Sequence, residues 1–257
     1  MKVNSLKLIK MSNSPSFSLN SPLVKSQNSL LAAMPVQEFE RWAPHLEWVD
    51  LKLGQVLQES GTVISHVYFP TNAIISLLYV LEDGASTEIA VIGCEGVLNI
   101  AQIMSGHATL SRAVVQSAGS ALRVKASVIQ HDFNHSNQVR DLLLRYTEAL
   151  MAQMTQTAVC NRHHTLDQQL CRWLLLSLDR LRGNDLRMTQ ELIANLLGVR
   201  REGVTTAAVK LQKSGLIEYS RGLIHVLDRQ GLEARSCECY AVVKREYDRL
   251  LPACIGR

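Results

Sequence analysis

The most informative group of polar side chains lies between residues 200 and 213 of this 257-residue chain. Arginine can donate two hydrogen bonds to guanine O6 and N7, and glutamate can accept one from cytosine N4. Threonine can hydrogen-bond a base edge or touch the thymine methyl group, whereas lysine further along suits phosphate oxygens. The residues with these chemistries are Arg200, Arg201, Glu202, Thr205 and Thr206 for base edges, and Lys210 and Lys213 for phosphates.

The surrounding residues predict how this group is positioned. Residues 188–217 read MTQELIANLLGVRREGVTTAAVKLQKSGLI, which is typical of two short helices that meet at a glycine. Thr189 is expected to cap the first helix and Gly198 to allow the tight turn. The second helix is expected to run from residue 200 or 201 to Lys213. A helix-turn-helix of this kind places its second helix in the major groove of DNA.

The stretch LIEYSRGLIHVL that follows predicts two strands around Ser220-Arg221-Gly222. Such a hairpin would complete a winged helix, with Arg221 at its tip. Contacts to DNA phosphates are therefore expected from Thr189, Lys210, Lys213 and Arg221. The alternative is that residues 188–227 form a helical hairpin that only packs on the protein's own core.

Charge is distributed unevenly along the chain. Residues 1–159 carry 11 Lys/Arg and 12 Asp/Glu, a net charge of −1, whereas residues 160–257 carry 16 and 11, a net charge of +5. The basic half is the one with the helix-turn-helix, as a phosphate-facing domain requires. Scattered cysteines favour reduced thiols, and no run approaches the roughly 20 apolar residues of a membrane span. We therefore expect a cytoplasmic protein with no membrane partner.

Short apolar runs between glycines predict an antiparallel sandwich or barrel in the first half of the chain. Before them, residues 1–28 are rich in Ser, Asn and Lys and are predicted to be a disordered leader. The candidate strands are His66–Phe69, Ala73–Leu81, Thr87–Ile92, Ser111–Gln116 and Ala121–Val124.

A long helix is predicted to begin near Ser136 or Asn137, and one apolar stripe runs along it. Such a stripe must be buried against something. It packs either on its own domain or, in parallel, on the same helix of a second subunit. We assign it to a dimer interface formed by Val139, Leu142, Leu143, Tyr146 and Leu150.

Together these features resemble the Crp/Fnr superfamily of bacterial transcription regulators, over residues 29 to about 228. The resemblance implies an α+β fold with an N-terminal antiparallel β-roll similar to cyclic-nucleotide-binding domains, a long dimerisation helix and a C-terminal winged helix-turn-helix. We accordingly expect a leader over residues 1–28 and a sensor-like β-roll over 29–135. The dimerisation helix is expected over 136–160, and the winged-helix domain with a C-terminal helix over 161–257.

The resemblance further implies a homodimer on a palindromic site in double-stranded DNA, with recognition helices about 34 Å apart. Arg201 and Glu202 match the family's Arg-Glu pair. Thr206 stands where many members carry a second arginine, and Arg200 where a small capping residue is frequent, so a typical family operator is not expected. RNA polymerase is a further candidate partner, and no enzymatic activity is expected.

A candidate ligand pocket also follows from the resemblance. Cyclic-nucleotide-binding members use a Gly-Glu turn for the ribose and a strand arginine for the phosphate, and here Gly93, Glu95 and Arg112 occupy the similar segments. Arg112 is displaced by one residue from the position of the family's strand arginine, and a shift of one residue in a strand turns a side chain to the opposite face. The effector therefore stays unidentified and cAMP is disfavoured. The alternatives are a cyclic-nucleotide-responsive regulator with a shifted arginine and a thiol- or metal-responsive regulator.

Other chemistries have less support in the sequence. Iron–sulfur members of the family carry cysteines near the N-terminus, whereas the first cysteine here is Cys94. Cys237 and Cys239 form a close pair, but residues two apart in a helix point about 200° away from each other, so we assign no metal site and no cofactor. Cupin enzymes share the β-roll but need a His-x-His motif, which the chain lacks. A cyclic-nucleotide module acting on another protein would not need a winged helix.

Overall fold

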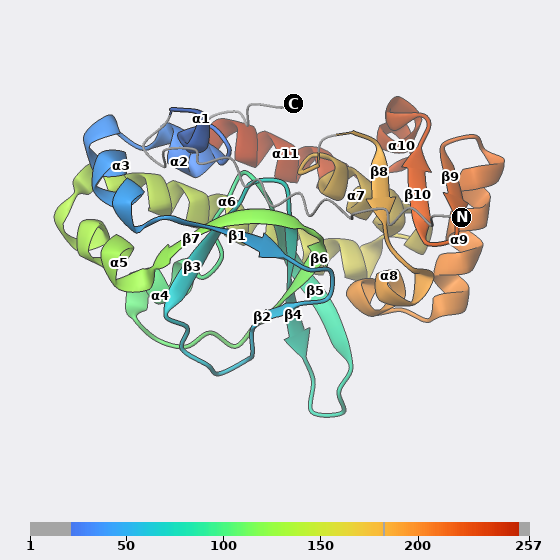
Figure 1. Cartoon of the computed structure of the whole chain (residues 1–257). Coiled ribbons are helices and arrows are strands. Elements are labelled where there is room, and N and C mark those ends of the chain that lie inside the picture. The colour runs from blue at the N-terminus through green and yellow to red at the C-terminus, as the bar shows by residue number, and fades with distance from the viewer. Residues whose placement is uncertain (1–21, 182, 252–257) are drawn as a thin grey trace, which may run out of the picture.

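The computed structural model describes residues 22–181 and 183–251, which form an α+β fold (Figure 1). The N-terminal half is α1 (Pro22–Lys25), α2 (Ser29–Ala33), α3 (Val36–Trp42), the 3-10 helix η1 (Ala43–His45), β1 (Glu47–Leu51), β2 (Val56–Gln58), β3 (His66–Pro70), β4 (Ile74–Val80), β5 (Ser86–Ile92), α4 (Ile100–Ser105), β6 (Arg112–Ser117), β7 (Gly119–Lys125) and α5 (Ala126–His135). The remainder is α6 (Asn137–His163), α7 (Leu166–Leu178), β8 (Asp185–Arg187), α8 (Gln190–Leu197), α9 (Arg201–Lys213), β9 (Ile217–Ser220), β10 (Leu223–Val226), α10 (Arg229–Arg235) and α11 (Glu238–Leu250).

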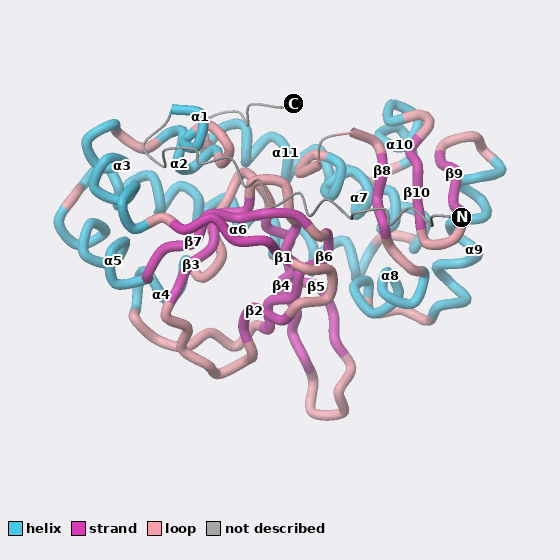
Figure 2. The backbone as a smooth tube through the Cα atoms, viewed as in Figure 1, coloured by secondary structure: helices cyan, strands magenta, loops and turns pink. Residues whose placement is uncertain are grey.

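Two antiparallel sheets form the β-roll (Figure 2). The first has the strand order β1-β7-β3 and the second β2-β6-β4-β5. Apolar side chains from both sheets, among them Phe69, Ile75 and Leu122, are fully buried in one core. Removal of this surface from water is the main source of stability, and the expected antiparallel β-roll is confirmed.

The five strands predicted from the sequence are all present, with ends shifted by at most two residues. The sequence analysis missed β1 and β2. In β1 only Leu51 is buried, and β2 has three residues, so neither strand shows the alternation of apolar and polar residues by which strands are recognised.

The predicted leader extends too far toward the C-terminus. Residues 1–21 lie outside the described part of the chain, but Val24 and Asn28 are packed on the β-roll. Val24 is buried, and the buried Asn28 side chain accepts from Leu30 N at 3.1 Å to cap α2. Its amide also donates to the carbonyl oxygens of Pro70 and Gly96, each at 2.9 Å. The Ser/Asn-rich composition indicated disorder, although one of these asparagines, Asn28, caps a helix.

The long helix α6 is present, capped by Ser136 as predicted, but its apolar stripe faces inward. All five residues assigned to the dimer interface are buried within the single chain, from 0% exposed for Val139 to 5% for Leu150. The hydroxyl of Tyr146, for example, donates to the Val97 carbonyl at 3.0 Å. That interface assignment is therefore wrong, because periodicity identifies a buried face but not what covers it.

The C-terminal helix α11 covers another side of α6 (Figure 1). Gln153 Nε2 of α6 lies 3.5 Å from the Tyr247 hydroxyl, and Arg249 pairs with Glu148 at 2.7 Å. The expectation that this helix belongs to the DNA-binding domain is incomplete, since it contacts α6 more than α7. Within the described residues, no helix has both the length and the apolar character required to cross a bilayer.

A chain of buried polar groups crosses the second sheet into α7. The Ser76 hydroxyl lies 2.6 Å from Glu88 Oε2 and 2.7 Å from Gln116 Oε1, and Gln116 Nε2 donates to Ser177 Oγ at 3.0 Å. Ser76 has one proton for two acceptors. A protonated Glu88 resolves this shortage by donating to Ser76. Burial also raises the pKa of Glu88 to about 7, against the smaller opposing effects of Ser76 and Arg172.

We expect Glu88→Gln to change how stability depends on pH. Between pH 4.5 and 7 the folded chain retains a proton that the unfolded chain has released, so the free energy of unfolding falls as the pH rises. The full loss is at most about 3 kcal/mol. Urea titrations from pH 5 to 8 should show this decline in the wild type and not in Glu88→Gln. Exposed Glu82→Gln is the control, and an equal decline in both variants would contradict the assignment.

Candidate nucleic-acid interface

The helix-turn-helix is built as its sequence predicts. Thr189 caps α8 by accepting from Leu192 N at 3.2 Å. Gly198 ends α8 in the left-handed region, with φ of 66°, a conformation that costs glycine little. Helix α9 begins directly afterwards at Arg201, with Arg200 in extended conformation at its N-cap. The turn therefore brings both arginines to the exposed N-terminal end of α9.

One face of α9 is buried and the opposite face is open. Val204 and Leu211 are fully buried, and Ala207 and Ala208 nearly so. Residues that lie opposite this stripe, one or two turns apart, are exposed, among them Glu202, Thr206 and Lys213. An α-helix with one free face at this position can enter the major groove, which is about 12 Å wide.

Among the predicted contact residues, Thr205 and Lys210 have side-chain partners on other helices, and the Thr206 hydroxyl donates to the Glu202 carbonyl within α9 at 2.9 Å. Thr205 is half-buried, and its hydroxyl donates to Gln190 Oε1 of α8 at 2.6 Å, so it joins the two helices. Lys210 Nζ lies 3.1 Å from Asp167 Oδ2 at the start of α7. Both side chains would have to exchange these partners before they could contact DNA, unlike Arg201 and Glu202.

The wing is a three-stranded sheet with the order β8-β10-β9. Its tip is a two-residue turn in which Arg221 and Gly222 have φ of 49° and 76°. Arg221 is exposed there, as predicted. The hydroxyl of Tyr219 donates to the Met188 carbonyl at 2.8 Å, which fixes the wing beside the start of the helix-turn-helix.

Comparisons with known proteins identify this arrangement. Residues 168–235 match the family model of the Crp-like helix-turn-helix domain. Those residues therefore carry a Crp-like helix-turn-helix domain. The matched unit implies DNA binding.

Solved structures show that the Crp/Fnr fold extends over most of this chain. A putative transcriptional regulator of the Crp/Fnr family from Eubacterium rectale superposes with a TM-score of 0.63 at 18% identity, covering 81% of this chain and 97% of that one. FixK2 from Bradyrhizobium japonicum superposes with a TM-score of 0.63 at 18% sequence identity, and the match covers 75% of this chain and 98% of FixK2. The c-di-GMP responsive global regulator CLP from Xanthomonas campestris superposes with a TM-score of 0.58 at 14% sequence identity, and the match covers 76% of this chain and 100% of CLP. No curated relative matches the sequence.

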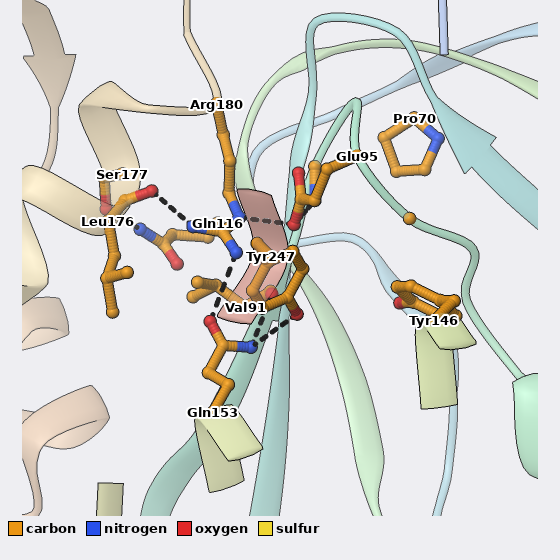
Figure 3. Close-up of polar contacts among 12 residues, drawn as sticks. Pro70, Val91, Glu95, Gln116, Tyr146, Gln153, Leu176, Ser177, Arg180 and Tyr247 are labelled. Carbon is orange, nitrogen blue, oxygen red and sulfur yellow. Dashed lines mark hydrogen bonds and ion pairs between the residues drawn. The ribbon is translucent and has the colours of Figure 1, made fainter. Parts of the chain in front are cut away.

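The predicted ligand glutamate is engaged by an arginine of the protein itself (Figure 3). Glu95 and Arg180 are 5% and 3% exposed, and Arg180 Nε lies 2.7 Å from Glu95 Oε1. Arg180 follows α7, so the contact joins the β-roll to the DNA-binding half. A Cβ on Gly93 would come within 2.6 Å of the Arg180 side chain, which accounts for glycine at that position.

Arg112 does not share a site with Glu95 in this structure. Arg112 Nε pairs with Glu59 Oε2 at 3.0 Å, and both side chains are partly exposed. The next residue along β6, Ala113, is fully buried, so Arg112 lies on the outer face of the sheet. The three predicted pocket residues are thus divided between a buried ion pair and a surface ion pair.

The sequence analysis missed Arg180 and its neighbours. Arg180 also donates to the Leu176 carbonyl at 2.7 Å and to Gln153 Oε1 at 3.2 Å, and it lies over the Tyr247 ring at 5.6 Å (Figure 3). The only signal was an arginine directly after an apolar helix. Its side-chain partners Glu95 and Gln153 lie 85 and 27 residues away, and no local pattern identifies such partners.

We expect Arg180→Met to lower the free energy of unfolding by about 3–5 kcal/mol, because it leaves the buried Glu95 carboxylate without its partner. Chemical denaturation measures this loss. The double variant with Glu95→Gln should lose less than the sum of the single variants. Arg123→Met, which breaks the exposed pair with Glu47, is the control and should have little effect. Additive losses in the double variant would contradict the pairing.

Proposed function

We propose that the protein binds a palindromic site in double-stranded DNA as a homodimer, reading bases with the N-terminal end of α9. The exposed face formed by Glu202 and Thr206, with a buried stripe behind it and exposed Arg201 at the first position of the same helix, is the observation that carries this proposal. Arg200 at the N-cap extends the same face. Lys213 and Arg221 flank it as phosphate contacts, since both are exposed at the far end of α9 and the tip of the wing.

The roles of the remaining residues follow from their contacts. Thr189 presents its backbone at the N-terminus of α8, where the helix dipole favours a phosphate. Thr205 and Lys210 take part once they leave Gln190 and Asp167. Because Thr206 replaces the second arginine frequent in the family, the preferred site is expected to lack the guanine that such an arginine would read.

We expect Arg201→Ala to weaken binding to the preferred site by about 1–3 kcal/mol and to relax base preference at one position of each half-site. Selection of bound sequences from random DNA, followed by titration of the best site, measures both effects. Arg140→Ala, at the far end of α6, is the matched control. Unchanged sequence preference in Arg201→Ala would contradict base reading by this residue.

Phosphate contacts are expected to behave differently. Lys213→Ala should weaken binding to all sequences alike and reduce the salt dependence of binding by about one unit of slope, because one fewer counterion is released. Titrations of specific and random DNA at several salt concentrations measure this. A loss confined to the preferred sequence would instead assign Lys213 to base reading.

A different face of α6 suits the dimer contact that is typical of the family. Leu144, Met151 and Ala158 recur every seven residues and are exposed, with Leu144 45% and Met151 62% accessible. An apolar residue every seven positions supplies one of the two contact positions of the heptad by which parallel helices pair. This face supports the proposed homodimer in place of the buried stripe originally assigned to it.

We expect the double variant Leu144→Asp/Met151→Asp to be monomeric and to lose affinity for a palindromic site, because each chain would then bind one half-site. Analytical ultracentrifugation and DNA titration measure the two effects. Val63→Asp, at an equally exposed apolar residue before β3, is the control. A variant that stays dimeric would refute this interface without affecting the proposed base contacts.

The effector in this proposal is a molecule other than a cyclic nucleotide bound at Glu95. Arg180 already neutralises that carboxylate, and Arg112 is on the outer face of β6. RNA polymerase remains a predicted partner.

A further inference from the structure

Four metal-binding side chains meet where α6 ends and α11 begins. Cys160 lies in the last turn of α6, and His164 caps that helix. Cys237 is the N-cap of α11, and Cys239 lies in its first turn. One ligand atom from each, three sulfurs and a ring nitrogen, lie within 4.8 Å of one another. The three cysteines are buried in a cluster separate from the main core.

The sequence analysis placed Cys237 and Cys239 on opposite sides of one helix. That expectation is wrong, because Cys237 precedes the helix in extended conformation, with φ of −81° and ψ of 166°. The 100° rotation per residue of a helix therefore does not separate the two sulfurs. Both sulfurs turn toward the end of α6, where Cys160 lies 77 residues before Cys237 in the chain.

The distances match the edges of a small coordination tetrahedron. Cys160 Sγ lies 3.5 Å from Cys237 Sγ, and Cys239 Sγ lies 3.6 Å from His164 Nδ1. Zinc bonds of about 2.3 Å to sulfur and 2.0–2.1 Å to nitrogen give tetrahedral edges of about 3.6–3.8 Å. A disulfide would need the sulfurs at about 2.05 Å. The group thus has the ligand types and spacing of a Cys3His site.

The outer contacts also suit a metal. His164 Nε2 lies 3.3 Å from Glu238 Oε2, so the carboxylate holds the ring with Nδ1 toward the sulfurs. Metal-bound histidines commonly have such a carboxylate on the other nitrogen. Three thiolates and Zn²⁺ carry a net charge of −1. Buried Arg172 lies beside them, donating to Thr157 Oγ1 at 2.7 Å one helical turn before Cys160.

We propose that Cys160, His164, Cys237 and Cys239 bind one Zn²⁺ ion that joins the end of α6 to the start of α11. Thiolate and imidazole ligands select zinc over hard cations, and four protein ligands leave no position open for catalysis. The site is therefore structural. It is distinct from the DNA-binding face and does not depend on the function proposed for it.

Protein purified in reductant without chelator is expected to contain one zinc per chain by elemental mass spectrometry. Cobalt exchanged into the site should give the visible absorption of tetrahedral thiolate coordination. Cys237→Ser should lose the metal, whereas Cys171→Ser, at a buried cysteine of the main core, should retain it. No zinc after purification and none bound on addition of Zn²⁺ would overturn the proposal. Iron with acid-labile sulfide in the purified protein, or a Cys160–Cys237 disulfide that persists in reductant, would also overturn the proposal.

A second variant tests the site without disturbing its core. Glu238 is 74% exposed, so Glu238→Gln is not expected to affect folding. Loss of its contact to His164 should weaken zinc binding about 10–100-fold, measured by competition with a chelator. Asp248→Asn, further along α11, is the matched control. Equal zinc affinity in Glu238→Gln and the wild type would exclude His164 as a ligand oriented by this carboxylate.

Discussion

The buried ion pair between Arg180 and Glu95 is the contact on which the arrangement of this molecule depends. One guanidinium meets the turn after β5, the end of α7, α6 and the ring of Tyr247 on α11. A charge with so little access to water becomes costly once its opposite charge is removed. The β-roll and the winged helix are therefore held in one relative position by a constraint much more exacting than apolar packing alone.

This constraint bears on what the β-roll can sense. Glu95, predicted from the sequence as a ligand contact, is already paired within the protein with Arg180, which follows the helix leading into the winged helix. The turn between α8 and α9 also rests on the roll, since a Cβ on Gly198 would lie 3.1 Å from Thr87 Oγ1 of β5. A signal that displaced Arg180 would act on both contacts, because they join the same two parts of the chain.

The sequence predicted local structure well and long-range partners poorly. Thr189, Gly198 and the turn at Arg221 are recognised because capping, a left-handed glycine and a tight hairpin each depend on a few adjacent residues. The inner stripe of α6 was recognised as buried, but its covering by the roll and α11 was not. Arg180 and the Cys3His group were missed for the same reason, as their partners are distant in sequence. The shift of Cys237 out of the helix by one residue decided whether two sulfurs could meet.

Because α11 packs on α6, the core around α6 is completed only when the last helix of the described chain has been synthesised. The winged helix leaves the ribosome before residues 238–250, so the DNA-reading unit can fold while one flank of its supporting helix is still uncovered. The buried side chains of Tyr247 and Leu250 arrive last. A chain ended early, just after the wing, would keep a complete reading unit but expose an apolar flank of α6. Chaperones and proteases would then encounter an unfinished core in a molecule whose recognition surface is intact.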